Sequence, residues 1–334
     1  MFPVDAPLAR QLIDTQFPQW SGLPLRRLDP AGSDHVIYRL GAELSARFPR
    51  HPGAVGQAAK EAAWLPVLAP HLPLTVPVPV AVGRADFGYP WSWGVPRWLP
   101  GTSAEGLGGS VETALTLAGF LSTLQSLPVP PPADDWPDAG PLAGRDPDTD
   151  AGPLPGRELD ADAGPLPGRE LDAGPLAGRD EVTRAAITEL AGFFDAAVLT
   201  RVWEEALEAP PWGRAPVWFH GDFHTGNLLA ADGRLSAVID FGGLGVGDPA
   251  TDLQIAYTLL EPAPRAAFRA ALDLDEATWA RGRGWTLTGG LLAHRAYAAG
   301  DARIAAQTTR QITAALADAA PAAGHATGRP AYRR

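Results

Sequence analysis

The stretch 227–243, NLLAADGRLSAVIDFGG, places the strongest constraint on the fold of this chain. Two short apolar runs, 228–230 and 235–239, are joined by Ala-Asp-Gly-Arg. An Asp-Gly pair between short apolar runs is a strong β-hairpin signal, because the favoured two-residue turn needs left-handed backbone angles at both central residues. The pattern therefore predicts a tight hairpin that turns at Asp232 and Gly233.

The predicted hairpin brings oxygen-bearing side chains together at one edge. Folding the chain at this turn places Asn227 opposite roughly residue 238, with Asp240 about two residues further on. Asp222 lies in the loop that leads into the first strand. Two carboxylates and an amide suit Mg²⁺, which takes one or two carboxylates and completes its shell with water and substrate phosphates. Asn227 is the only asparagine of the chain, and it offers oxygen without a third negative charge.

Periodicity divides the chain into a sheet-bearing part and a helical part. Residues 24–50 alternate as strands do, and the proline-punctuated segment 76–101 is typical of edge or hairpin strands. Helices are expected over 5–20, 54–69, 111–126, 181–209, 250–260, 276–299 and 302–319. Pro66 is expected to bend or end the second of these. The sequence therefore predicts a small lobe with a sheet over about the first 100 residues, followed by mostly helical structure.

Residues 139–180 contain an internal repeat, AGPLAGRDPDTD, AGPLPGRELDAD, AGPLPGRELD and AGPLAGRD. Each unit has glycine, proline and few large apolar residues, so stacked units would have almost no face to bury. This composition predicts a flexible insertion without a function of its own. A lid over a binding site is the alternative interpretation.

Composition restricts the classes of partner and site. The chain has 334 residues, 46% of them apolar, which suffices for a sizeable core in two lobes. It has no cysteine, so disulfides and thiolate metal sites are excluded. A net charge of −11 argues against nucleic acid as a partner and is compatible with a cationic substrate. We see no signal peptide and no membrane span, and expect a cytoplasmic protein.

A set of short motifs resembles a known family. HGD at 220–222, then Asn227 and IDFG at 239–242, resembles the catalytic loop and metal-binding segment of the protein-kinase fold. With GDPATDL at 247–253, the pattern is similar to the aminoglycoside phosphotransferase family of small-molecule kinases. The resemblance implies an α+β, bilobal protein-kinase-like fold with an antiparallel-sheet N-lobe over 1–98, a hinge at 99–101, a mostly helical C-lobe over 102–322 that carries the insertion, and a loose tail over 323–334.

The resemblance also implies the chemistry. Asp222 would be the catalytic base that positions and deprotonates an acceptor hydroxyl, and Asn227 and Asp240 would hold Mg²⁺ between the phosphates of ATP or GTP. The implied reaction is phosphorylation of a small molecule, for which an aminoglycoside or a related antibiotic is the family's emblematic acceptor. A kinase of choline, homoserine or a sugar is the alternative, as is a catalytically weak nucleotide-binding pseudokinase.

Upstream residues match the rest of the family pattern. Arg47 stands on a predicted strand where the family usually has a lysine that contacts the nucleotide phosphates, and Arg50 is its competitor. Glu61, on the following helix, would hold that cation. Lys60, the only lysine, lies on the helix rather than on the strand, so we do not assign it this role.

Two further segments would contact the nucleotide in this family. The turn with Gly32 and Ser33 at its tip would cover the phosphates, although it is not glycine-rich. Trp98 and Leu99, in PRWLPG, would flank the purine base.

Several polar residues near the motifs are expected to support them. His220 is expected to brace the loop through hydrogen bonds, His224 to be structural or exposed, and Asp252 to anchor the loop backbone. Asp248, followed by proline, is typical of a helix N-cap. The alternation His220, Asp222, His224 is also compatible with a metallohydrolase site, but only scattered histidines follow it.

Overall fold

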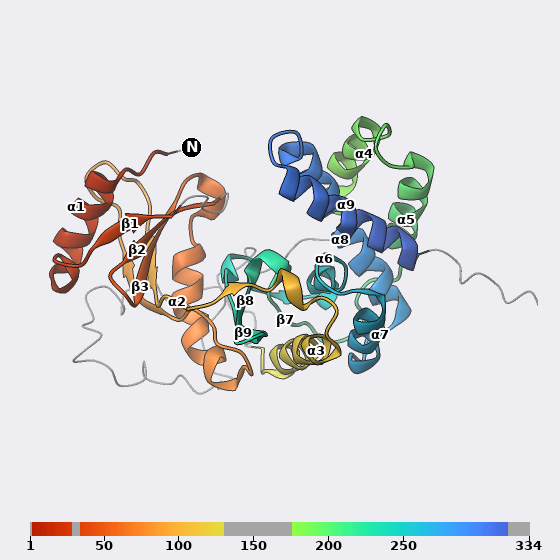
Figure 1. Ribbon diagram of the computed structural model, residues 1–334, viewed down its shortest axis with the longest axis horizontal. Coiled ribbons are helices and arrows are strands. Elements are labelled where there is room, and N and C mark those ends of the chain that lie inside the picture. The colour runs from red at the N-terminus through yellow and green to blue at the C-terminus, as the bar shows by residue number, and fades with distance from the viewer. Residues whose placement is uncertain (1, 29–33, 130–175, 320–334) are drawn as a thin grey trace, which may run out of the picture. The chain divides into compact units, whose positions relative to one another are not determined.

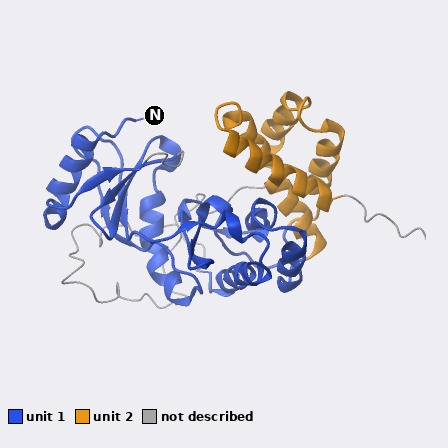
Figure 2. Cartoon of the chain, in the orientation of Figure 1, with its two compact units in different colours: residues 1–174, 212–274 blue, residues 175–211, 275–334 orange. Residues whose placement is uncertain are grey.

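The computed structural model describes residues 2–28, 34–129 and 176–319. Gly32 and Ser33, most of the predicted insertion and the predicted tail lie outside the described residues. The chain forms two compact units, the first of residues 1–174 and 212–274 and the second of residues 175–211 and 275–334 (Figure 2). In the described ranges no helix has both the length and the apolar character that a membrane crossing requires.

A five-stranded antiparallel sheet forms the N-terminal part of the first unit (Figure 1). Its order is β1-β2-β3-β5-β4. The strands are β1 Leu25–Arg27, β2 His35–Leu40, β3 Leu44–Pro49, β4 Pro79–Gly83 and β5 Trp93–Pro96. Helix α1 Ala6–Gln16 precedes the sheet, and α2 Gln57–Leu68 connects β3 to β4.

Alternation along β2 and β3 separates an apolar face of this sheet from a polar one. Tyr38 and Phe48 belong to a buried core, in which the Phe48 ring stacks on Trp93 with 4.6 Å between centroids. Arg47 pairs with Ile37 in the β2–β3 register, and it therefore lies on the opposite face from its neighbour Phe48. The sequence pattern of β3 thus places a cation on the face away from the core.

The remainder of the first unit consists of short strands and helices. Strands β6 Thr102–Ser103, β8 Leu228–Ala231 and β9 Arg234–Val238 form one small sheet, and β7 Val217–Phe219 pairs with β10 Gly245–Gly247 in another. Helix α3 Val111–Ser126 packs against β7 and against α7 Pro262–Ala271, and the short α6 Ile255–Thr258 precedes α7.

The predicted hairpin is confirmed. Asp232 and Gly233 have φ values of 52° and 75°, the left-handed conformation that the turn requires. In the β8–β9 register Leu228 pairs with Val238, and the N–H of Ile239 donates to the carbonyl of Asn227 at 2.9 Å. Asn227 therefore faces Ile239, one residue from the position that counting from the turn predicts.

The second unit is helical. It contains α4 Asp180–Glu189, α5 Ala196–Glu208, α8 Glu276–Tyr297 and α9 Ala302–Asp318. Buried polar side chains pair between its helices, as in the 2.7 Å hydrogen bond between the side chains of Thr183 and Thr288. Such pairing offsets the cost of burying polar groups between helices.

The predicted α+β class is confirmed, with local differences at prolines. The helix expected over 5–20 ends at Gln16, because Phe17 precedes Pro18 and leaves the helical conformation with φ −134° and ψ 70°. Pro66 lies inside α2, which continues to Leu68. Helix α7 was not predicted: it begins at Pro262, a first-turn position where the missing proline N–H costs nothing.

Candidate active site

The loop that carries Asp222 follows β7 and is fixed by a buried carboxylate. Asp252 accepts the backbone N–H of His220 at 2.7 Å and that of Gly221 at 2.8 Å. Burial raises the pKa of Asp252 to about 7, although both hydrogen bonds act in the opposite direction. Asp252 lies in a 3₁₀ helix that Asp248 caps by accepting the N–H of Ala250. The structure confirms the expected anchor and the expected cap.

Gly221 is the position at which this loop tolerates no side chain. Its φ is 84°, and an added Cβ would lie 2.0 Å from the carbonyl oxygen of Gly243. The backbone of the loop therefore lies directly against the turn that follows Asp240. This close approach brings the segment 220–222 next to the segment 240–243.

His220 braces the same two segments, as expected. Its Nδ1 accepts the backbone N–H of Asp222 at 3.2 Å, and its Nε2 donates to the carbonyl of Ile239 at 3.1 Å. Burial lowers the pKa of His220 to about 4, so the ring is neutral at pH 7. Because both ring nitrogens are used, His220 has no lone pair for a metal, which argues against the metallohydrolase interpretation. The described residues also contain no group of three His, Cys, Asp or Glu side chains suited to a metal.

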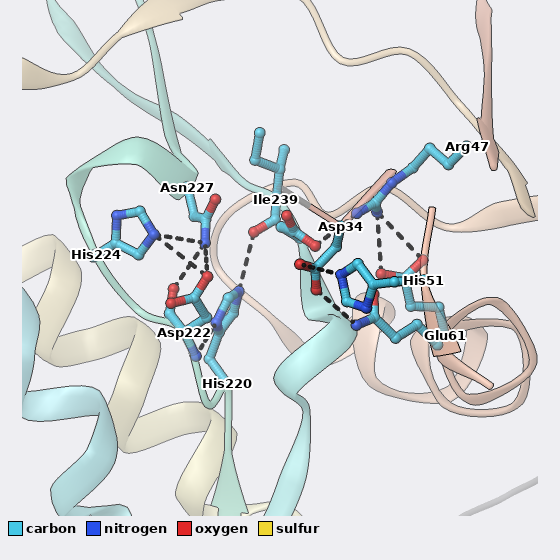
Figure 3. Close-up of polar contacts among 11 residues, drawn as sticks. Asp34, Arg47, His51, Glu61, His220, Asp222, His224, Asn227 and Ile239 are labelled. Atoms are coloured by element: carbon cyan, nitrogen blue, oxygen red, sulfur yellow. Dashed lines mark hydrogen bonds and ion pairs between the residues drawn. The ribbon is translucent and has the colours of Figure 1, made fainter. Parts of the chain in front are cut away.

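Asp222 and Asn227 lie together in one loop, as Figure 3 shows. The Nδ2 of Asn227 donates to the carbonyl of Asp222 at 2.8 Å and to its Oδ2 at 2.9 Å. Burial raises the pKa of Asp222, but the hydrogen bond from the His224 side chain acts in the opposite direction, and the net shift is downward. Asp222 is therefore ionised at neutral pH. Since both amide hydrogens of Asn227 are used, its Oδ1 points away from the carboxylate.

A chain of ion pairs joins the sheet, α2 and the segment after β9. Arg47 Nη1 lies 3.2 Å from Glu61 Oε1, and Arg47 Nη2 lies 2.6 Å from Asp240 Oδ1. Burial raises the pKa of Glu61, and the Arg47 guanidinium acts against this rise. Burial likewise raises the pKa of Asp240, but the charge and hydrogen bond of Arg47 turn the net shift downward. The predicted Arg47–Glu61 pair is thus formed, and Asp240 joins it.

The oxygens of Asn227 and Asp240 fit a hard divalent cation. Asn227 Oδ1 is turned away from Asp222, and Asp240 uses Oδ1 for Arg47, which leaves Oδ2 for another ligand. Asp240 has φ 65° and ψ 66°, a left-handed conformation that short polar side chains tolerate at a cost of roughly 1–2 kcal/mol. One carboxylate and one amide, with phosphate and water, are a donor set that Mg²⁺ takes.

Trp98 contacts the turn between β2 and β3 and a side chain of β2. Its backbone N–H donates to the carbonyl of Glu43 at 2.6 Å, and the guanidinium of Arg39 lies 4.0 Å from the centre of its ring. Trp98 and Leu99 are both half-buried. The N–H of Trp98 is therefore already used within the protein.

Two other groups near Arg47 were not predicted. His35 is 5% exposed on β2, and burial together with the charge of Arg47 lowers its pKa to about 4. Asp34 contacts the Nε2 of His51 at 3.2 Å and accepts from Gln57 at 3.3 Å (Figure 3). The sequence signal for His35 is its alternate position on β2, two residues before Ile37, the partner of Arg47.

Comparison with known proteins identifies the family. The profile of the phosphotransferase enzyme family matches residues 26–285. An aminoglycoside 3'-phosphotransferase of Escherichia coli is 38% identical over 61 residues, which are 18% of this chain and only 22% of that relative.

Solved structures show the same fold over most of the chain. The GDP and kanamycin complex of APH(2")-IIia matches with a TM-score of 0.64 and 18% identity, covering 93% of this chain and 99% of that one. Macrolide 2'-phosphotransferase MphH from Brachybacterium faecium matches with a TM-score of 0.51 and 22% identity, covering 96% and 99%. At these identities the likeness establishes the kinase-like fold. The family profile spans most of the chain, and the chain therefore belongs to the phosphotransferase enzyme family.

Proposed function

We propose that the protein transfers the γ-phosphoryl group of ATP or GTP to a hydroxyl group of a small molecule. The observation that carries this proposal is the gathering of Asp222, Asn227 and Asp240 on two adjoining segments, with Asp240 tied to Arg47. Phosphoryl transfer requires a base, oxygen ligands for a metal ion, and a positively charged side chain that contacts the phosphates. Membership of the family supports the same reaction.

Asp222 is proposed as the catalytic base. Its Oδ2 accepts from Asn227, which leaves Oδ1 for the hydroxyl of the acceptor. The hydroxyl oxygen attacks the γ-phosphorus, the bond from that phosphorus to the β-phosphate oxygen breaks, and the hydroxyl proton passes to Asp222. Because the carboxylate is ionised at neutral pH, it is in the state that accepts a proton.

Asn227 and Asp240 would hold the cation, and Arg47 would contact the phosphates. Mg²⁺, when bound, offsets negative charge that builds up on the phosphate oxygens. Glu61 keeps Arg47 oriented through the 3.2 Å ion pair. Arginine carries a permanent charge and a planar fork whose terminal nitrogens can pair with two acceptors at once. Glu61 and Asp240 provide these acceptors.

The proposed roles of the two lobes follow the family resemblance. We propose that residues 1–98 cover the nucleotide, with Gly32 and Ser33 over the phosphates, that 99–101 connect the lobes, and that 102–322 carry catalysis and the acceptor. Trp98 and Leu99 would flank the base. Because the N–H of Trp98 is donated to Glu43, other backbone groups of the connection would bind the purine edge.

We propose an aminoglycoside or a related antibiotic as the acceptor. Two observations support this proposal: a protein of the same fold, APH(2")-IIia, forms a complex with GDP and kanamycin, and the net charge of −11 favours a cationic ligand. A macrolide, choline, homoserine or a sugar is tested alongside. A nucleotide-binding protein without turnover is the outcome that would favour a pseudokinase.

The test is a phosphorylation screen with ATP and with GTP against these acceptors. Asp222→Ala is expected to lower kcat by about a hundredfold to ten-thousandfold, the range for loss of a general base. Asp232→Asn is the matched control, because Asp232 is exposed in the same hairpin and asparagine suits its turn position. Full turnover in Asp222→Ala would refute the proposed role.

A further inference from the structure

His224 lies between the two residues of the catalytic loop that the proposed mechanism uses. Its Nε2 is 3.4 Å from Asp222 Oδ2 and 3.3 Å from Asn227 Nδ2, and its Nδ1 is 3.0 Å from the backbone nitrogen of Gly226 (Figure 3). These three contacts cannot all be hydrogen bonds of a neutral ring, because neutral imidazole has one donor and one acceptor.

The backbone decides which ring nitrogen carries the proton. A main-chain N–H is always a donor, so the Nδ1 of His224 must accept from Gly226 and is unprotonated. The proton of the neutral ring therefore sits on Nε2. Asn227 has no hydrogen left for this nitrogen, because its two amide hydrogens go to the carbonyl and to Oδ2 of Asp222. The 3.3 Å contact between His224 and Asn227 thus joins two donors, and the acceptor for Nε2–H is Asp222 Oδ2.

We propose that His224 is a positioning residue for the catalytic base: its Nε2–H, together with the amide of Asn227, holds Oδ2 of Asp222 and leaves Oδ1 as the atom that receives the acceptor proton. This inference rests on the proposed function of Asp222. It assigns to His224 a role in turnover in addition to its capping of the 3₁₀ turn Thr225–Asn227.

The close packing of Gly226 supports this arrangement. A Cβ added at Gly226 would lie 2.7 Å from Cε1 and 3.1 Å from Nδ1 of the His224 ring. The ring therefore rests against the backbone of Gly226, and any larger residue there would have to displace it. Loop and ring together fix the distance from Nε2 to the carboxylate.

Two substitutions separate the capping role from the positioning role. In His224→Asn the amide oxygen can accept the Gly226 N–H in place of Nδ1, but the side chain is too short to reach Asp222. In His224→Gln the amide nitrogen can take the place of Nε2 and donate to Asp222 Oδ2. Positioning predicts that kcat falls about tenfold in His224→Asn, with the KM for nucleotide unchanged, and that it recovers to within about threefold of wild type in His224→Gln.

Capping alone predicts the reverse order, with His224→Asn close to wild type and His224→Gln less stable. That result would overturn the proposal, as would equal loss of kcat in both variants accompanied by an equal loss of Tm. If wild-type turnover survives Asp222→Ala, the proposed function fails and His224 has no base to position. If Asp222→Ala abolishes turnover while His224→Asn does not change it, the proposed function stands and only the role of His224 is refuted.

A measurement independent of turnover tests the contact itself. Long-range proton–nitrogen NMR of protein with ¹⁵N-labelled histidine reports which ring nitrogen is protonated, and the His224→Asn variant identifies the resonance. We expect an Nε2–H tautomer for His224 and a change in its Nε2 signal in Asp222→Asn. A proton on Nδ1, or an Nε2 signal that is unaffected by the Asp222 substitution, would overturn the proposal.

Discussion

Arg47 Nη2 lies 2.6 Å from Oδ1 of Asp240, a residue 193 positions further along the chain. The other terminal nitrogen of the same guanidinium contacts Glu61 Oε1 at 3.2 Å. The guanidinium of Arg47 thereby joins β3, α2 and the segment after β9. Each of these elements carries a residue of the proposed phosphate and metal site, so this ion-pair chain connects the elements that form the site.

Removing the charge of Glu61 is expected to weaken both the fold and nucleotide binding. Glu61 and Arg47 are nearly buried, with side chains 5% and 11% exposed, so Glu61→Gln leaves a buried cation with one partner. We expect unfolding in urea to require about 3 kcal/mol less free energy and the KM for nucleotide to rise. The control is Glu205→Gln, which removes an exposed pair with Arg201 and should cost less than about 1 kcal/mol. Equal effects of the two substitutions would contradict this account.

Replacing Asn227 by aspartate tests why an amide is needed there. In Asn227→Asp a second carboxylate would face Asp222 Oδ2 at the 2.9 Å position where the amide now donates. Like charges at this distance raise the pKa of Asp222 and disorder the loop. We expect kcat at least about a hundredfold below wild type. Steady-state kinetics over a range of Mg²⁺ concentrations would check this, and an Asn227→Asp enzyme with normal kcat would show that the amide is dispensable.

Part of the site could be predicted from the sequence, because its geometry is local. The Asp-Gly turn determines the β8–β9 hairpin, and the hairpin determines the neighbourhood of Asn227. The one-residue difference in register arises because the β8–β9 pairing contains an irregularity between Leu229 and Ala230. Counting from the turn assumes a regular ladder and cannot detect such a bulge.

The contacts that depend on distant segments could not be predicted. Nothing in LSARFPR indicates that Arg47 reaches Asp240, since that contact requires the sheet and the hairpin to be placed beside each other. The contact of His224 with Asp222 is local, but the sequence predicts only a structural or exposed histidine. The direction of this hydrogen bond follows from the acceptors of the Gly226 and Asn227 N–H groups, which only the structure provides. Helix α7 was missed because two prolines in its first turn hide the periodicity.

Acid is expected to destabilise the protein partly through His220. Its pKa is 6.5 in the unfolded chain and about 4 in the folded protein, where burial disfavours the charged ring. Between these values the unfolded state binds more protons, so the free energy of unfolding falls as pH falls from 6.5 to about 4. The full contribution of this one group is about 3 kcal/mol.

The His220→Asn variant isolates this contribution, since asparagine can still accept the N–H of Asp222. Its unfolding free energy, measured by urea titration at several pH values, should depend less steeply on pH in this window, by up to about 1.4 kcal/mol per pH unit. Leu115→Ala, at an exposed leucine that has no titratable group, should leave the wild-type slope unchanged. Identical slopes in wild type and His220→Asn would show that His220 is not the group responsible.

Asp252 is expected to stabilise the loop, because its two carboxylate oxygens accept the backbone N–H groups of His220 and Gly221. In Asp252→Asn one of the backbone N–H groups of His220 and Gly221 loses its acceptor and meets an amide donor instead. A buried unpaired N–H costs about 1–3 kcal/mol, and the loop should become mobile enough to lower kcat. Asp248→Asn serves as the control, because asparagine is as good an N-cap as aspartate. Hydrogen exchange of the backbone amides of His220 and Gly221 would report the loss of these hydrogen bonds directly. If both amides exchange as slowly in Asp252→Asn as in wild type, Asp252 does not anchor the loop.

A crystal structure with Mg²⁺ and a non-hydrolysable ATP or GTP analogue would locate the metal ion and the nucleotide relative to Asp222, Asn227 and Asp240. We expect a metal ion about 2.0–2.1 Å from Asn227 Oδ1 and from a carboxylate oxygen of Asp240, with the terminal phosphate near Asp222. A nucleotide bound elsewhere, or a metal held without Asn227 and Asp240, would contradict the proposed site.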